Sequence, residues 1–345
     1  MKNYQQVIEY LNNKNRKKHL LMGNGFSIAY DYDIFSYNSL NSFIESIDNK
    51  LLNKLFEITD NKNFEVVMQQ LDNFKEIAKV FDADKTLLSN IDSTSSLLKE
   101  SLISAVKKLH PEHVFTVSEE KSRSCFQWLN EYLSTGGNIF TSNYDLLLYW
   151  VLMRNSSKHH VDGFGRDKES EEYVPSEEAE YSELRWGKHS DIQNVHYLHG
   201  ALQIFDQGIE IIKEEYNGYQ NLLEVINDKM SNKEYPIFIT AGDGDEKLKN
   251  IMHNRYLTYC YEKLAQISGS LVTFGFNFGE YDMHIIDAIN KAAKGYYDAN
   301  NNFQKLYSIY IGVFSESDEK HIKSIQDKFK CKVNIFDSKT ANIWG

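Results

Sequence analysis

The chain has 345 residues, of which 41% are apolar, and its 38 Lys and Arg against 49 Asp and Glu give a net charge of -11. These values exclude a mini-domain and a disordered chain, and the acidic balance argues against non-specific binding of nucleic acid, whose phosphates repel such a surface. The three cysteines, Cys125, Cys260 and Cys331, are scattered singly, so neither a disulfide framework nor a four-cysteine zinc site can be assembled from them, and we expect a soluble protein of the reducing cytoplasm.

The first third of the chain predicts a strand followed by a long helical insertion. Apolar residues at helical spacing occupy positions 4–11, and a short apolar run at 19–22 then indicates a strand that stops at Gly23. From residue 39 to residue 110 apolar residues again recur at helical spacing, and Pro111 closes the block. We therefore expect a helical insertion or subdomain over residues 39–115.

Strands and helices are predicted to alternate through the rest of the chain. Helices are expected at 119–133, 144–153, 219–230, 246–267, 282–294 and 318–329. Strands are expected at 138–141, 194–198, 201–205, 235–240, 271–276, 306–314 and 332–336. This alternation is typical of an α/β fold with a Rossmann-like, doubly wound, mainly parallel sheet, and we predict a single domain over residues 1–345.

A long polar segment at residues 155–193, rich in Glu, Ser and Gly, interrupts this alternation and is predicted to be a loop. It is either a surface loop that packs locally or a lid that contacts a partner.

Short polar segments follow several predicted strands, at the sheet edge where doubly wound folds bind ligands. The first is Gly23-Asn24-Gly25-Phe26-Ser27. Glycine at positions 23 and 25 lets the backbone approach a phosphate closely, although a plain tight turn explains the same residues. In the second segment, Thr141-Ser142-Asn143-Tyr144-Asp145, the polar side chains either cap the next helix or face a ligand.

Two further segments stand at later strand ends. His196 and His199 point to opposite faces of one strand, which argues against a shared metal, and His199 at the strand's end is the better candidate base. The last segment runs from Gly275-Phe276-Asn277 to Asp282 at the start of a helix, and its polar residues either cap that helix or bind ribose hydroxyls.

In this order the segments resemble those of the sirtuin family of NAD-binding proteins. Residues 23–27 resemble the sirtuin Gly-Ala-Gly-Ile-Ser loop, residues 141–145 the Thr-Gln-Asn-Ile-Asp motif, and His199-Gly200 the His-Gly of the catalytic strand. Gly275-Phe276-Asn277 resembles the loop that contacts the adenosine half of NAD. The closer resemblance is to bacterial sirtuin-like proteins of anti-phage defence, including those of Kongming-type systems.

Two departures separate the chain from the protein-deacylating sirtuins. It lacks the paired Cys-x-x-Cys motifs of their zinc ribbon, and Asp31, Asp33 and Phe35 stand without the Arg of the Pro-Asp-Phe-Arg stretch. Both departures argue against an acyl-lysine substrate.

The resemblance implies an NAD glycohydrolase (NADase) that releases nicotinamide and ADP-ribose and depletes NAD in abortive infection, with no metal. It implies that Asn143 orients ribose and water, Asp145 binds the nicotinamide carboxamide, and His199 acts as the base. The loop at 23–27 would hold the pyrophosphate by its backbone N–H groups. The expected cofactor-binding residues are Gly23, Asn24, Gly25, Phe26, Ser27, Asp33, Ser142, Gly275, Phe276, Asn277 and Asp282.

Two other functions fit the same residues, a catalytically silent sensor of NAD or ADP-ribose that regulates a partner, and an ADP-ribosyltransferase. The resemblance also implies control by a homo-oligomer or by a partner subunit. The partners it suggests are a HerA-like ATPase, a short Argonaute or a nucleotide-sensing pyrophosphatase-like protein. Direct contact with nucleic acid or membrane is not expected.

Overall fold

Parallel strands form the central sheet of the computed structural model, which describes residues 1–35, 50–59, 64–109, 114–155, 159–166, 183–216, 221–232, 234–239 and 243–345. Its spatial order is β1-β14-β13-β10-β2-β3-β6. The strands are β1 (Lys2–Asn3), β2 (Lys18–Met22), β3 (Ile139–Thr141), β6 (Val195–Tyr197), β10 (Gly269–Phe274), β13 (Leu306–Val313) and β14 (Lys332–Asp337). All their pairings are parallel.

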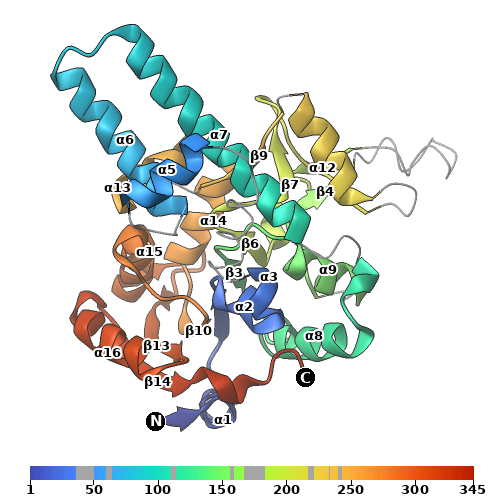
Figure 1. Cartoon of the computed structure of the whole chain (residues 1–345). Helices are drawn as coiled ribbons and strands as arrows, with labels where there is room; N and C mark the ends of the chain where they lie inside the picture. Colours follow the sequence, from blue (N-terminus) through green and yellow to red (C-terminus); the bar gives the residue numbers. More distant parts are fainter. Residues whose placement is uncertain are drawn as a thin grey trace, which may run out of the picture.

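The strand order identifies where this sheet should bind ligands. Leaving the edge strand β1 aside, the chain passes from β2 outward through β3 to β6, then returns to the other side of β2 and continues through β10, β13 and β14. The two directions diverge between β2 and β10, which is the topological switch point of a doubly wound sheet. The predicted Rossmann-like α/β fold is confirmed (Figure 1).

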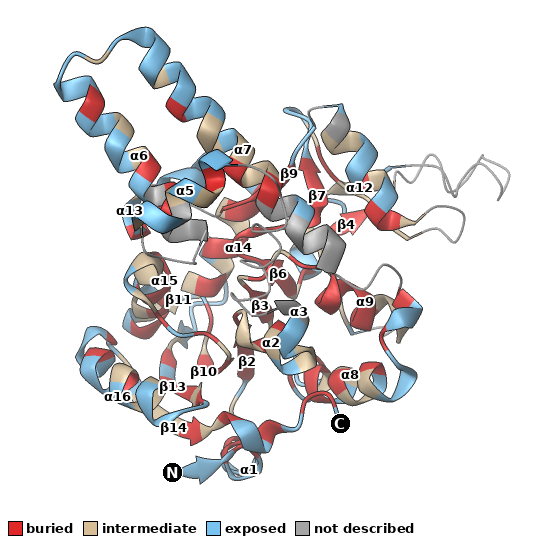
Figure 2. Cartoon of the chain, in the orientation of Figure 1, coloured by how far each residue is buried: buried red, intermediate tan, exposed pale blue. Residues whose placement is uncertain are grey.

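Helices flank this sheet, and both β2 and β10 are buried at every position, as parallel strands covered on two faces require (Figure 2). The helix α8 contacts β2 and β3, whereas α15 and α16 contact β13. The helices outside the insertion are α1 (Tyr4–Asn13), α2 (Gly25–Tyr30), α3 (Tyr32–Phe35), α8 (Glu119–Leu133), α9 (Leu147–Arg154), α12 (Leu222–Ser231), α13 (Gly244–His253), α14 (Arg255–Ala265), α15 (Met283–Lys294) and α16 (Glu316–Ile325). Short 3-10 turns are η1 (Val114–Thr116), η2 (Ser190–Ile192), η3 (Glu280–Asp282), η4 (Gln326–Lys328) and η5 (Ser338–Ala341).

A second sheet, antiparallel, has the order β4-β5-β8-β7-β9. Its strands are β4 (Phe164–Gly165), β5 (Leu184–Trp186), β7 (Gly200–Asp206), β8 (Ile211–Lys213) and β9 (Pro236–Phe238), and a separate hairpin joins β11 (Tyr296–Tyr297) to β12 (Phe303–Gln304). The prediction that strands at 201–205 and 235–240 belong to the mainly parallel sheet is therefore wrong. Only Leu198 and His199 separate β6 from β7, and a parallel crossover needs a dozen residues or more.

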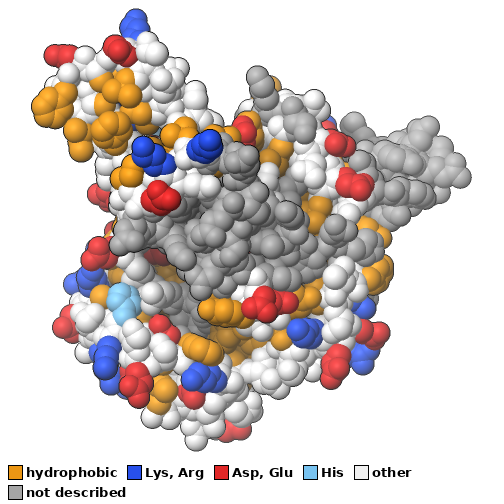
Figure 3. Space-filling model, viewed as in Figure 1, with side chains coloured by type: hydrophobic (Ala, Val, Ile, Leu, Met, Phe, Trp, Pro, Cys, Tyr) orange, Lys and Arg blue, Asp and Glu red, His pale blue; other side chains and the backbone are white. Residues whose placement is uncertain are grey.

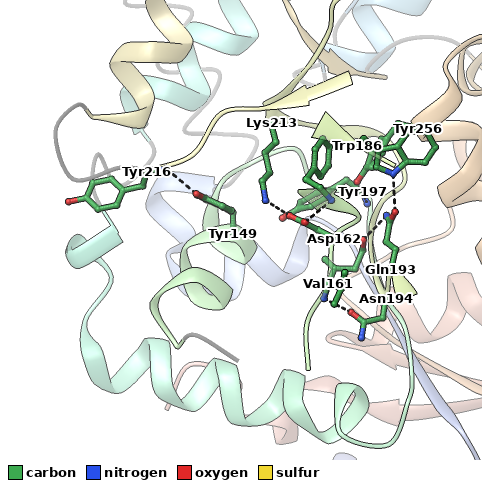
Figure 4. A network of polar contacts seen from close by, with 12 residues as sticks. Tyr149, Val161, Asp162, Trp186, Gln193, Asn194, Tyr197, Lys213, Tyr216 and Tyr256 are labelled. Carbon is green, nitrogen blue, oxygen red and sulfur yellow. Dashed lines mark hydrogen bonds and ion pairs between the residues drawn. The ribbon is translucent and has the colours of Figure 1, made fainter. Parts of the chain in front are cut away.

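The predicted loop at 155–193 is also partly wrong, because it contains β4 and β5. Figure 4 shows how side chains anchor the described parts of this segment. The side chain of Asn194 accepts from the N–H of Val161 at 2.8 Å, and Trp186 Nε1 donates to Gln193 Oε1 at 3.0 Å. The described part of this segment thus contributes two strands to the second sheet, and the hydrogen bonds of Asn194 and Gln193 hold the residues around them.

The described part of the predicted helical insertion is helical. It comprises α5 (Lys50–Thr59), α6 (Phe64–Val80) and α7 (Lys85–Leu109), while residues 36–49, 60–63 and 110–113 lie outside the described residues. The helices α6 and α7 form a hairpin that projects from the sheet (Figure 1). Phe74, Ile77 and Phe81 are exposed towards its tip, where Figure 3 shows apolar side chains gathered. Among the described residues, no helix combines the length and apolarity needed to cross a membrane.

Candidate functional site

The carboxyl ends of four neighbouring strands bring the predicted polar segments together. Met22 of β2 is paired with Phe274 of β10 on one side and with Thr141 of β3 on the other, and Thr141 is paired with Tyr197 of β6. The segments that follow these four residues therefore leave the sheet at one edge, beside the switch point. This is the edge at which doubly wound folds bind nucleotides.

The loop after β2 and the loop after β10 are in direct contact. The N–H of Gly25 donates to the carbonyl of Gly275 at 3.0 Å, and Gly275 has a φ of +63°. A Cβ atom on Gly25 would lie 2.5 Å from the Cα of Gly275, and one on Gly23 would lie 2.5 Å from the Gly275 carbonyl oxygen. Glycine is needed at these positions because two backbones meet there.

This contact limits the expected role of the loop at 23–27 as a set of phosphate donors. The N–H groups of Gly23, Gly25, Phe26 and Ser27 all donate to backbone carbonyls of the protein. A pyrophosphate could accept from these groups only if those internal hydrogen bonds were given up or shared. In this conformation the loop contributes shape and close backbone packing to the site.

The ring of Phe26, a residue expected to bind the cofactor, lies in the core. It is 1% exposed, and it lies 5.0 Å from the ring of Trp344 and 6.3 Å from the ring of Trp128, measured between centroids. Trp344 Nε1 also donates to the Phe26 carbonyl at 3.2 Å. The side chain belongs to the core because an apolar ring gains more there than at a polar sheet edge, and it fastens the loop to the end of the chain.

A buried hydrogen-bond chain links the first two polar segments. Ser27 Oγ donates to Asp145 Oδ2 at 2.5 Å, and Asn143 Nδ2 donates to Ser27 Oγ at 2.9 Å. The other carboxylate oxygen of Asp145 accepts from the N–H of Leu147 at the start of α9. All three polar side chains are at most 9% exposed. The arrangement holds an amide and a carboxylate in fixed positions at the switch point.

His199 stands at the end of the neighbouring strand and is also buried. Its Nε2 lies 2.9 Å from Nε2 of His284, on the first turn of α15. Burial, with the nearby charge of Lys247, lowers the pKa of His199 to about 3. The pKa of His284 is lowered to about 3 by burial and His199, with Asp282 raising it and Lys247 lowering it further. Both rings are therefore neutral at neutral pH, as a general base must be before it accepts a proton.

Within the part of the chain that the structure describes, His199, Asp282 and His284 are also the residues that could hold a metal, since their ligand atoms lie within 4.8 Å of one another. Two features do not fit a cation. The wholly buried ammonium of Lys247 lies 3.3 Å from Asp282 Oδ1 and forms an ion pair with that carboxylate. The imidazole centroids are 5.1 Å apart although the nitrogens are 2.9 Å apart, so the rings point nearly end to end. Ligands of one metal instead point towards a third position.

The remaining predicted residues lie in varied surroundings. Asn24 and Ser142 are half-buried, and the Ser142 N–H donates to the Met22 carbonyl, which ties the second segment to β2. Phe276 is buried and packs edge-on against Phe278, whereas Asn277 is exposed.

Asp282 is half-buried in its ion pair with Lys247, and Asp33 is exposed on α3. Sequence reasoning missed Lys247 and His284 as parts of this cluster. The only signal was that His284 closely follows the polar segment after β10.

A cavity of about 400 Å³ lies elsewhere, between α9 and the second sheet. Its lining includes Tyr149, Asp162, Tyr197 and Lys213, and none of the residues predicted for the site lines it. Lys213 Nζ and Asp162 Oδ2 form an ion pair at 2.5 Å (Figure 4). Because those charges neutralise one another, we place the chemistry at the strand ends instead.

Comparison with known families gives one finding. A family model described as a domain of unknown function (DUF4917) matches residues 20–344. The match begins in β2 and ends at Trp344, so it includes every segment of the site described above. A search among curated proteins returns no match to the chain.

Proposed function

The chain belongs to the DUF4917 family, and from its site we propose that it hydrolyses NAD at the nicotinamide–ribose bond to give nicotinamide and ADP-ribose. One observation carries the proposal. The buried chain Asn143–Ser27–Asp145 and a neutral His199 stand on adjacent strand ends, beside the switch point of a Rossmann-like sheet. Such folds bind dinucleotides at this point.

For this reaction the protein has to hold NAD and a water molecule in position and to supply a base. Nicotinamide leaves the C1′ carbon with the electron pair of the broken C–N bond, and its departure neutralises the pyridinium cation. Water forms the new C1′–O bond and gives its proton to His199, directly or through a ribose hydroxyl. The Asn143 amide would orient the ribose and the water, while Asp145 would hold the carboxamide, in roles carried over from the sirtuin resemblance.

The first prediction tests this assignment by nicotinamide release from NAD, measured on the protein activated by its trigger and partner. We expect His199→Gln and Asn143→Ala to lower kcat/KM, the first by roughly 100- to 10,000-fold because it removes the base. His253→Ala is the matched control, since His253 is exposed on α13. Thermal melting of each variant would check that it is folded. Release that survives both site substitutions would contradict the proposal.

A silent sensor is the second candidate, and a specific observation favours it. Ser27 is fully buried, both Asp145 oxygens accept hydrogen bonds within the protein, and His199 is 3% exposed. A site closed in this way suits a protein that binds without turnover. Calorimetric binding of NAD or ADP-ribose by the wild type, without nicotinamide release even when partner and trigger are present, would favour the sensor. Transfer of label from NAD to a macromolecule would instead indicate an ADP-ribosyltransferase.

The cellular role follows from the resemblance to defence proteins and is part of the same proposal. We expect NAD to fall in phage-infected bacteria that carry the wild-type chain, and to stay constant in bacteria that carry His199→Gln. Restraint by a second copy or by a partner subunit would keep the enzyme inactive before infection.

A further inference from the structure

The partner of His199 is the feature of the site that the proposed chemistry leaves unused. His284 is 1% exposed and lies 85 positions later in the chain, on a different element of the fold. The hydroxyl of Tyr261 donates to the His284 carbonyl at 3.2 Å, which holds this turn of α15 in place. The two imidazoles are thus brought together by packing between α14, α15 and the end of β6.

The contact between the rings fixes where protons can be. A neutral imidazole carries one proton, and two Nε2 atoms at 2.9 Å need one proton between them. If His199 donates this proton, its Nδ1 has a free lone pair and can act as a base. If His284 donates it, Nδ1 of His199 carries a proton and the ring cannot act as a base there.

We propose that His284 is a positioning residue that accepts the Nε2 proton of His199 and so holds His199 in the tautomer whose Nδ1 is basic. The inference rests on the proposed hydrolysis, in which His199 is the base. During the reaction, water gives its proton to Nδ1 of His199 as the C1′–O bond forms and the C1′–N bond breaks. The Nε2 proton stays in the hydrogen bond with His284, and the carboxylate of Asp282 offsets part of the new positive charge.

The surrounding charges agree with this role. Lys247 and Asp282 form an ion pair at 3.3 Å beside the histidine pair. Burial above all, and the charge of Lys247, keep both rings neutral before the reaction. The carboxylate of Asp282 raises the pKa of His284 and so favours a positive charge on the pair.

The kinetic test compares two replacements of His284. Phe keeps an aromatic ring at this position but cannot accept the proton, whereas the amide oxygen of Gln can. We therefore expect His284→Phe to lower kcat roughly 10- to 100-fold with KM unchanged. We expect His284→Gln to recover part of that loss. His196→Phe is the matched control, because His196 is another fully buried histidine, stacked on Phe140, and should leave kcat unchanged. Full kcat in His284→Phe would overturn the inference.

A second measurement does not depend on turnover. In protein labelled with ¹⁵N-histidine, we expect the NMR signals of wild-type His199 to show a protonated Nε2 and a bare Nδ1, and those of His284→Phe to show a mixture of tautomers. A protonated Nδ1 on wild-type His199 would overturn the inference. If the wild type releases no nicotinamide even with its trigger and partner present, the proposed function fails while these spectra still decide the pairing. If a chelator abolished nicotinamide release and Zn²⁺ restored it, the two histidines would bind a metal instead of sharing a proton, and the inference would be overturned.

Discussion

Gly25 and Gly275 approach each other so closely that neither position has room for a side chain. The sequence motif around Gly25 predicted a close approach of the backbone to a phosphate. The structure shows a close approach of two loops, one after β2 and one after β10. The ring of Phe26, in the same loop, turns into the core. The motif shows that a small residue is needed at this position, but it does not show whether a ligand or another part of the protein lies close to it.

Gly25→Ala is therefore expected to destabilise the fold. The new Cβ would lie 2.5 Å from the Cα of Gly275, and a backbone atom cannot move aside as a flexible side chain does. We expect a loss of about 1–3 kcal/mol in the free energy of unfolding, measured with urea.

Gly279→Ala is the matched control in the same region. A Cβ at that position meets no atom within 4 Å and φ is -63°, so the free energy of unfolding should change by less than about 0.5 kcal/mol. Equal losses in the two variants would argue against the loop contact as the cause.

Asn254 divides what the sequence predicts as a single helix over 246–267 into α13 and α14. Apolar spacing runs on through this position, so periodicity predicts no break. The Asn254 side chain accepts from the N–H groups of Tyr256 and Leu257, and this cap starts a new helix. Its Nδ2 also donates to Asp206 of the second sheet at 2.8 Å. The break lets α13 carry Lys247 to the histidine pair while α14 contacts β6 and α15.

Removing this cap should weaken the junction between the helices. We expect Asn254→Ala to lower the free energy of unfolding by about 1 kcal/mol, because two helix N–H groups lose their acceptor. Asn254→Ser keeps a capping oxygen and should recover most of that loss in the same urea titration. Equal stability of Ala and Ser at this position would show that the cap contributes little.

Buried neutral histidines tie the stability of the entire chain to pH. Burial is the largest cause that lowers the pKa of His19, His196, His199 and His284, each to about 3. His19 lies in the central strand β2, where Nδ1 accepts from the Asn138 N–H and Nε2 donates to the Ser268 carbonyl. Protonation of Nδ1 would break the first of these bonds.

The direction of the pH effect follows from these shifts. An unfolded histidine has a pKa of about 6.5, so between pH 6.5 and pH 3 the unfolded chain binds more protons than the folded chain. The stabilising contribution is complete above pH 6.5 and is lost as the pH falls. We expect each of these histidines to contribute up to about 1.4 kcal/mol of lost stability per pH unit below 6.5.

Urea titrations at pH 7.5, 6.5 and 5.5 would measure this slope. His196→Phe removes one buried histidine and should make the slope shallower, whereas His253→Ala removes an exposed one and should not. A slope that both variants leave unchanged would mean that buried histidines do not control acid stability.

Apolar runs and their spacing were enough to predict the doubly wound sheet, because a strand covered on both faces needs apolar residues throughout. The order of the polar segments and their place at strand ends were enough to predict that they meet at one edge of the sheet. The spacing of apolar residues shows which residues are buried but not what they pack against. It therefore could not show that β7 turns back into an antiparallel sheet, or that Phe26 faces the core. His199 and His284 are 85 positions apart, and their contact depends on how helices pack on the sheet. No local sequence pattern contains this long-range packing, so only the tertiary structure shows that His199, the candidate base, is paired with a second histidine.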